Sequence, residues 1–133
     1  MNEELLYPSG ETINRLTREL QLEGADKYTQ DWEYEVADIN QLPKYINYYK
    51  TEQLNLNEKS TLMRIILEAY NDYRETNNKE DVYHDVINDL LVNEYFIHQE
   101  TLKYWGCGNE ELENCFAITP FIRIIRDKMA DAL

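Results

Sequence analysis

The chain has 133 residues with 26 acidic and 13 basic side chains, which gives a net charge of −13. Proteins that bind nucleic acid or an anionic membrane surface directly need lysines and arginines to meet the phosphates, so the charge argues against both classes of partner. With 43% apolar residues and a length typical of one domain, residues 1–133 are expected to fold as a single domain.

Three features of the sequence bear on its cellular compartment. No apolar run approaches the roughly 18 residues of a membrane span, so we expect no such span. Met1–Leu6 lacks a basic region followed by an apolar one, so we expect no signal peptide and a cytoplasmic location. Cytosolic thiols are kept reduced, and the acidic stretch between Cys107 and Cys115 opposes a reactive thiolate. Both cysteines are therefore expected to be inert thiols.

The pattern of the first part of the chain predicts one helix, followed by a short segment with alternating residue types. Residues 11–23 have apolar side chains at the spacing of a single helix face, namely Ile13, Leu16 and Leu20. Residues 31–36 alternate acidic with aromatic or apolar side chains, and that period of two suggests an extended segment. Because no partner strand is evident, an irregular or helical conformation stays open.

The next two helices are predicted from their N-terminal residues. Asn40 is a suitable N-cap for a helix over residues 41–50, whose first turn tolerates Pro43. Asn57 is expected to cap a helix over residues 58–75, in which apolar residues recur three and four positions apart.

Two helices are predicted in the last part of the chain. One runs from residue 80 to residue 104, and the other begins at Thr119-Pro120 and ends near Ala130. Glycine and proline are scarce, at 4 and 3 residues, which favours long helices over a many-turned sheet. The fold class is thus expected to be all-α, a bundle of four to five helices joined by short loops.

The sequence offers little for catalysis. It contains no phosphate-binding loop, nucleophile elbow or dinucleotide fingerprint. Asp81 precedes His84 by three residues and Glu94 precedes His98 by four, so each pair can share a helix face. Helical di-iron sites take a Glu-x-x-His motif from each of two helices and two further glutamates, whereas both pairs here lie on one predicted helix. We therefore predict no enzyme activity, no catalytic residue, no metal and no cofactor, with a helical metal-dependent enzyme as the third alternative.

Two acidic clusters with interleaved aromatic residues are the candidate partner-binding sites. The first comprises Asp31, Trp32, Glu33, Tyr34, Glu35 and Asp38. The second lies on the predicted 80–104 helix, where aspartates four residues apart form a ridge on one face, and it comprises Asp81, Tyr83, Asp85 and Asp89. Exposed aromatic side chains ringed by charge are typical of tight protein interfaces, and a solvated face is the alternative interpretation.

Several stretches share one further pattern: Trp32–Asp38, Lys44–Ile46, Asn57–Lys59, Leu62–Ile66, Tyr70–Asp72, Tyr104–Trp105 and Ile118–Phe121. Together, over about residues 30–125, they resemble small acidic bacterial immunity proteins, the antitoxins of polymorphic-toxin and contact-dependent growth inhibition systems. The resemblance implies a chain that binds and neutralises a cognate secreted toxin, and it assigns no site residue by itself.

A nuclease is the expected toxin, because a nuclease presents a basic cleft to its phosphate substrate and a carboxylate-rich inhibitor is attracted to that cleft. The alternative function is an acidic interaction or regulatory adaptor domain, including a nucleic-acid mimic.

Overall fold

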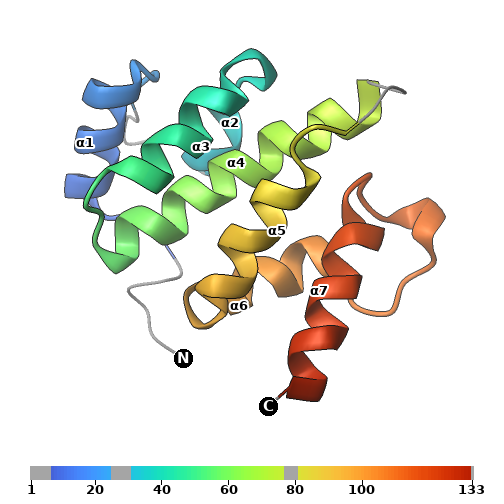
Figure 1. Ribbon diagram of the computed structural model, residues 1–133. Coiled ribbons are helices and arrows are strands. Elements are labelled where there is room, and N and C mark those ends of the chain that lie inside the picture. Colours follow the sequence, from blue (N-terminus) through green and yellow to red (C-terminus); the bar gives the residue numbers. More distant parts are fainter. Residues whose placement is uncertain (1–6, 25–30, 77–80, 133) are drawn as a thin grey trace. The chain divides into compact units, whose positions relative to one another are not determined.

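The computed structural model describes residues 7–24, 31–76 and 81–132 (Figure 1). These residues form seven α-helices and two short 3-10 helices, and no strand is found among them. The all-α class is therefore confirmed, whereas the expected number of four to five helices is too low. The chain forms two compact units, Met1–Ala69 and Tyr70–Leu133.

The first unit begins with α1 (Gly10–Leu20), α2 (Trp32–Glu35) and η2 (Ile39–Gln41). It continues with α3 (Leu42–Thr51) and with most of the long helix α4 (Leu56–Thr76), so the boundary between the two units falls inside α4. Its core is built from apolar and aromatic side chains of these helices, including Leu16, Trp32, Leu42, Tyr45 and Leu62.

The second unit contains the end of α4 followed by α5 (His84–Asn93) and α6 (Tyr95–Gly106). After η3 (Leu112–Asn114), the chain ends in α7 (Thr119–Ala132), which packs against α6 and α5. The core of this unit includes Ile87, Leu91, Leu102, Trp105 and Ile122.

The segment 31–36 is not extended. α2 covers Trp32–Glu35, and its hydrogen bonds run from Tyr34 N–H and Glu35 N–H back to the Asp31 carbonyl. Trp32 and Glu33 are both buried although they are adjacent. An extended strand would have turned them to opposite faces, so the alternation of residue types was a misleading signal.

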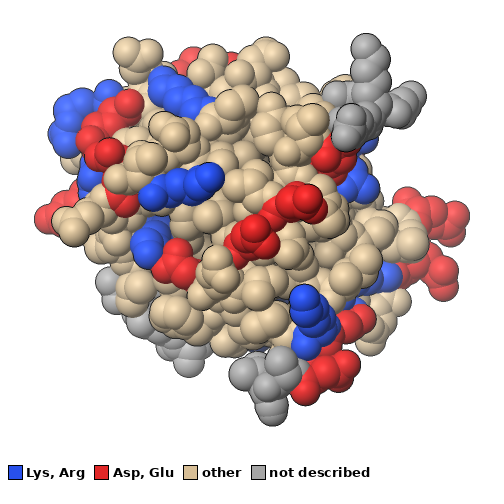
Figure 2. Space-filling model, in the orientation of Figure 1, with Lys and Arg blue, Asp and Glu red and all other residues tan. Residues whose placement is uncertain are grey.

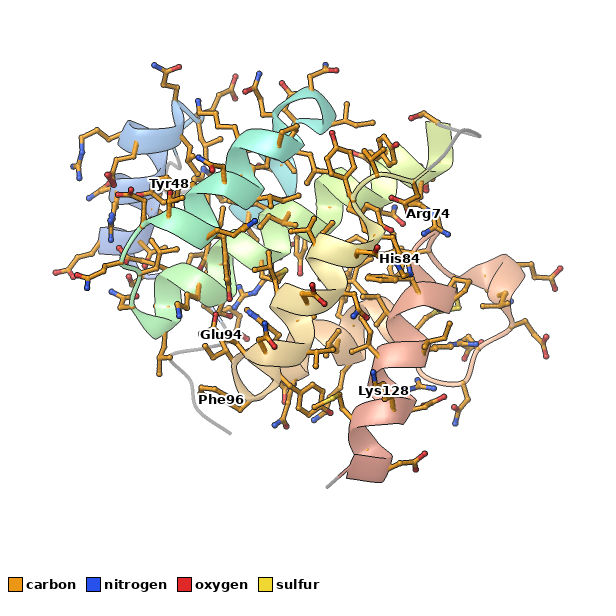
Figure 3. All side chains as sticks on the ribbon, in the orientation of Figure 1. Tyr48, Arg74, His84, Glu94, Phe96 and Lys128 are labelled. Atoms are coloured by element: carbon orange, nitrogen blue, oxygen red, sulfur yellow. A yellow bond between two sulfur atoms is a disulfide. The ribbon has the colours of Figure 1, made fainter. Side chains whose placement is uncertain are left out.

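The predicted 80–104 helix is interrupted. α5 ends and α6 begins around Glu94, whose backbone (φ −124°, ψ 40°) is not helical (Figure 3). No glycine or proline marks the break. The interruption lets α5 and α6 pack against each other and against α7, which two halves of one straight helix could not do.

The start of α4 also differs in detail from the prediction. The side chain of Asn55, not of Asn57, accepts the N–H of Glu58 at 2.8 Å, and the Glu58 carboxylate in turn accepts the N–H of Asn55 at 2.8 Å. This is the reciprocal arrangement of a capping box. Asn57 instead uses its side-chain amide to bind the backbone of Tyr7 and Ser9.

The two cysteines are joined, so the expectation of free thiols was wrong. Cys107 ends α6 in a left-handed conformation (φ 60°) that turns the chain back, and it forms a disulfide with Cys115. The two Cα atoms are 5.9 Å apart, which is the usual separation in a disulfide. The seven residues between the cysteines are therefore held in a covalent loop.

None of the described helices is both long enough and apolar enough to cross a membrane.

Candidate functional site

The first predicted cluster divides into buried and exposed residues. Trp32 is only 3% exposed, and its indole N–H donates to the carbonyl of Glu23 at 2.6 Å. Glu33 is only 5% exposed and pairs with Arg64 at 3.3 Å. Both side chains hold the first unit together, so the expectation that they are exposed contacts is corrected.

The remaining members of that cluster lie at or near the surface. Tyr34 is half-buried, and the exposed members are Asp31, Glu35 and Asp38. Asp38 also has a structural role, because its side chain accepts the N–H of Asn40 at 2.9 Å at the start of η2.

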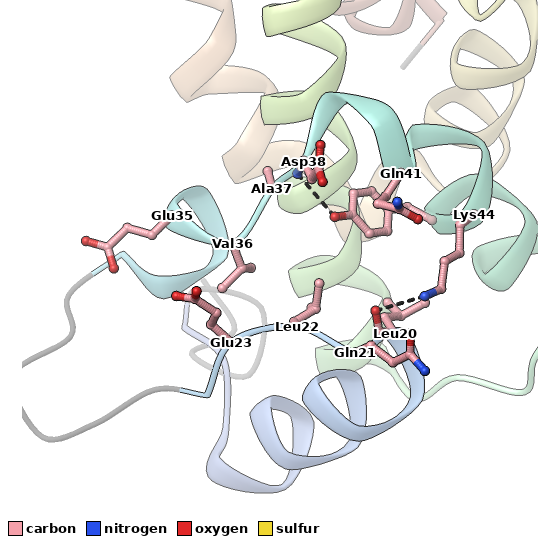
Figure 4. A pocket seen from close by; sticks show the side chains of 11 residues that line it. Leu20, Gln21, Leu22, Glu23, Glu35, Val36, Ala37, Asp38, Gln41 and Lys44 are labelled. Atoms are coloured by element: carbon pink, nitrogen blue, oxygen red, sulfur yellow. Dashed lines mark hydrogen bonds between the residues drawn. The ribbon is translucent and has the colours of Figure 1, made fainter.

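A pocket of about 420 Å³ opens beside these carboxylates (Figure 4). Its walls come from the end of α1 and the segment after it, from the end of α2 and the segment that leads into η2, and from the start of α3. The lining residues are Leu20, Gln21, Leu22, Glu23, Glu35, Val36, Ala37, Asp38, Gln41, Lys44 and Tyr45. The volume lies within the range of small-ligand sites, roughly 300–1,000 Å³. Sequence reasoning identified Glu35 and Asp38 but not the pocket.

Local backbone features shape this pocket. α1 stops at Gln21, a left-handed residue (φ 58°), so the chain leaves the helix sharply. The Lys44 ammonium donates to the carbonyl of Leu20 at 3.0 Å and joins α3 to the end of α1. The backbone N–H of Asp38 donates to the hydroxyl of Tyr45 at 3.1 Å. Burial raises the pKa of the Tyr45 phenol, because it disfavours the charged phenolate.

The charges of the pocket are unbalanced. Its lining includes three carboxylates, from Glu23, Glu35 and Asp38, and one ammonium group, from Lys44. In Figure 4, Glu35 and Glu23 lie at one end, the apolar side chains of Val36 and Leu22 in the middle, and Lys44 at the other end. The pocket is therefore acidic at the end away from Lys44.

The second predicted cluster also divides, because Asp81 precedes α5 instead of lying on it. One carboxylate oxygen accepts the N–H groups of Tyr83 and His84 at 3.0 and 3.1 Å, and so caps the helix. The other oxygen accepts from Arg74 at 3.0 Å and from the hydroxyl of Tyr70. Asp81 thus has a structural role that joins the end of α4 to the start of α5. The expected ridge of three aspartates is corrected to two, Asp85 and Asp89.

The other members of the second cluster lie on or next to α5. Asp85 and Asp89 are exposed on this helix. Tyr83 is half-buried, and its ring meets the ring of Tyr73 edge-on with centroids 4.9 Å apart. Asp85 and Asp89 are therefore the carboxylates of this cluster that are open to a partner.

The two histidines do not form a common site with carboxylates. His84 lies exposed at the start of α5 with its Nδ1 2.9 Å from Asp85, whereas His98 is buried in α6. Within residues 7–24, 31–76 and 81–132, no group of three or more His, Cys, Asp or Glu side chains is placed to hold a metal ion.

The surface charge is more uneven than the composition suggests. Of the described residues, fifteen acidic side chains are exposed: Glu11, Glu19, Glu23, Asp31, Glu35, Asp38, Glu52, Glu75, Asp85, Asp89, Glu110, Glu111, Glu113, Asp127 and Asp131. Only four basic side chains in the same ranges are exposed: Arg18, Lys50, Lys103 and Lys128. Figure 2 shows the carboxylates of one face spread over several elements.

The arginines explain this difference. Five of them direct their guanidinium groups to carboxylates or backbone carbonyls of the fold: Arg15, Arg64, Arg74, Arg123 and Arg126. Arg15, for example, pairs with Glu58 at 3.0 Å, and Arg123 donates to the carbonyl of Glu110 at 2.7 Å. Much of the positive charge is therefore used within the protein.

Comparison with protein-family models, with curated proteins and with solved structures finds no match for this chain.

Proposed function

We propose that the chain is a bacterial immunity protein, which binds a cognate toxin with a basic surface, a nuclease, and blocks it without catalysis or cofactor. The observation that supports this proposal best is the excess of exposed carboxylates, fifteen against four exposed basic side chains in the described residues. Complementary fields of this kind raise the rate of protein association.

The internal use of the arginines strengthens that argument. If the surface charge served only to keep the protein in solution, a mixture of exposed acidic and basic side chains would be sufficient. Here the guanidinium groups of Arg64 and Arg74 are paired with Glu33 and Asp81, which are not among the exposed carboxylates. Arg15 divides its donors between the buried Glu58 and the exposed Glu19. Most of the exposed acids therefore keep their charge without an arginine partner in the described residues. The resulting surface favours a basic protein over an acidic or neutral one.

Two contact surfaces are proposed, one on each unit, formed by the exposed residues of the two clusters. In the first unit these are Asp31, Glu35 and Asp38, and in the second unit Asp85 and Asp89. An inhibitor of an intracellular nuclease must act where the nucleic acid is, so the proposal places the protein in the cytoplasm.

The experiment is a binding assay against the product of the adjacent gene, with an inactive form of that protein immobilised. Two double variants, Glu35→Lys with Asp38→Lys and Asp85→Lys with Asp89→Lys, should each lower the association rate constant by about tenfold at low salt and flatten its salt dependence. Asp127→Lys with Asp131→Lys makes the same charge change on α7 and should have a smaller effect.

The outcomes separate the candidate functions. Inhibition of a toxin activity by the wild-type chain supports the immunity role. If the adjacent gene encodes no toxin and its product is bound, an adaptor role replaces it. Equal binding by all three double variants would show that the named carboxylates do not form the interface.

A further inference from the structure

We infer that the pocket between α1, α2 and α3 receives an arginine side chain from the protein partner. The identity of that partner rests on the proposed function, whereas the chemistry of the pocket does not. All of the lining residues belong to the first unit, so the inference depends on that unit alone.

The shape of the pocket suits a side chain with an apolar stem. Leu22, Val36 and Ala37 provide apolar surface in its lining. The pocket volume of about 420 Å³ admits a long side chain together with part of its flanking backbone or ordered water. Arginine buries its methylene stem along apolar surface while its charged end stays near polar groups.

The acidic end of the pocket is open to a cation from outside the described residues. No basic side chain in the described part of the chain pairs with the carboxylates of Glu23 or Glu35. The single ammonium group of the lining, that of Lys44, is bound to the Leu20 carbonyl at the other end. A second cation can therefore enter without competing for the partner that Lys44 already has.

The C-terminal end of α1 explains why Lys44 lies at the opposite end of the pocket from Glu23 and Glu35. α1 ends at the pocket wall with Leu20 and Gln21, and the C-terminal end of a helix has a partial negative charge. Lys44 shows that this charge attracts a cation, because its ammonium group binds the last helical carbonyl of α1.

Arginine suits the acidic end better than lysine. Its planar guanidinium offers five donors and can bind a carboxylate through two parallel hydrogen bonds, whereas the ammonium group of lysine acts as a point charge. It is also less strongly hydrated than an ammonium group and therefore costs less to bring into a half-enclosed site.

The test uses N-acetyl-arginine amide as the probe and N-acetyl-citrulline amide as its neutral isostere, with amide NMR spectra of the full chain. The arginine probe should shift the backbone signals of Leu22, Val36 and Ala37, and the citrulline probe should not. Glu23→Gln with Glu35→Gln should weaken arginine binding at least tenfold. The control, Glu11→Gln with Glu52→Gln, makes the same charge change in the same unit outside the pocket and should bind like wild type.

Two results would overturn the inference: equal shifts with both probes, or arginine binding that is the same in the pocket variant and the control. Matching far-ultraviolet circular dichroism spectra establish that the variants are folded.

Binding to the toxin separates this inference from the proposed function. If the toxin binds and the pocket variant binds it as tightly as the control, the pocket has no part in the interface and the proposed function stands. If no toxin binds but the arginine probe does, the pocket inference stands and the immunity role fails.

Discussion

Glu33 is a charged residue that lies inside the first unit, opposite the guanidinium of Arg64. The two side chains are 7% and 6% exposed and 3.3 Å apart, and Arg64 also donates to the hydroxyl of Ser60. Removing one member of a buried ion pair leaves the other charge without its compensation, which costs much more than the pair itself contributes.

Glu33→Gln should therefore lower the free energy of unfolding by about 3 kcal/mol, measured by urea denaturation. Glu33→Met with Arg64→Met removes both charges and should recover most of that loss. A double variant that is as unstable as the single one would show that packing, and not the buried charge, is responsible. The exposed neighbour Glu35→Gln should change stability by less than about 0.5 kcal/mol.

Tyr48 gives the first unit a dependence on alkaline pH. Burial, together with the hydrogen bond that its hydroxyl donates to Glu19, raises the pKa of Tyr48 to about 12. The ordinary pKa of a tyrosine is about 10, so the unfolded chain releases this proton first. The contribution of Tyr48 to stability is present below about pH 10 and is lost as pH rises toward about 12.

Urea denaturation between about pH 9 and about pH 12 should show this loss. Tyr48→Phe should show a smaller decrease in the free energy of unfolding over the same interval, although other tyrosines continue to titrate. Parallel curves for the two proteins would contradict the assignment.

At the scale of elements, the junction of α5 and α6 shows how one hydrophobic pattern can conceal two helices. The buried residues on either side of Glu94, such as Ile87, Leu91, Leu102 and Trp105, still fall on one face when placed on a continuous helix. Periodicity therefore cannot detect the break, which follows from the packing of both helices on α7.

The loop from Cys107 to Cys115 is held both by its disulfide and by arginines of α7. Arg123 donates to the carbonyls of Gly106 and Glu110 at 2.9 and 2.7 Å, and Arg126 donates to the carbonyl of Gly108 at 2.9 Å. The backbone of this loop is therefore tied to α7 by hydrogen bonds in addition to the covalent link between its ends.

Cys107→Ser with Cys115→Ser should lower the free energy of unfolding by roughly 2.5 kcal/mol, the chain-entropy value for so short a loop. Reducing the wild-type protein with a dithiol should have the same effect, and thiol titration before and after reduction checks the state of the sulfurs. If reduction leaves the wild-type stability unchanged, the disulfide does not contribute. The double variant has no disulfide, so its free energy of unfolding should be the same with and without the dithiol.

At the scale of the whole molecule, the excess of exposed carboxylates acts against folding. Like charges on a compact protein repel one another, and salt screens this repulsion. Raising the sodium chloride concentration from about 10 mM to about 0.15 M shortens the screening length from roughly 30 to 8 Å.

This increase in salt should raise the Tm, measured by circular dichroism. If screening adds about 1 kcal/mol to the free energy of unfolding, the Tm rises by roughly 3–5 °C for a chain of this length. Glu110→Gln, Glu111→Gln and Glu113→Gln together remove three exposed charges from the disulfide-bonded loop and should reduce the increase. If the Tm of this variant rises with salt as much as that of the wild type, screening of these charges is not the cause of the rise.

The sequence by itself was enough to determine the helical class, the net charge and the approximate extent of α3, α4 and α7, because the spacing of apolar residues and the composition depend only on neighbouring residues. Half of the ten predicted site residues followed in the same way, since Asp31, Glu35, Asp38, Asp85 and Asp89 are charged residues that lie exposed. The N-cap residues of α3 and α4 were predicted wrongly as Asn40 and Asn57. Only the tertiary structure decided that Trp32, Glu33 and Asp81 are used internally, that Cys107 pairs with Cys115, and that Glu23 and Lys44 join Glu35 around one pocket. The reason is physical: burial and pairing depend on groups that are distant along the chain, and these meet only after the helices have packed.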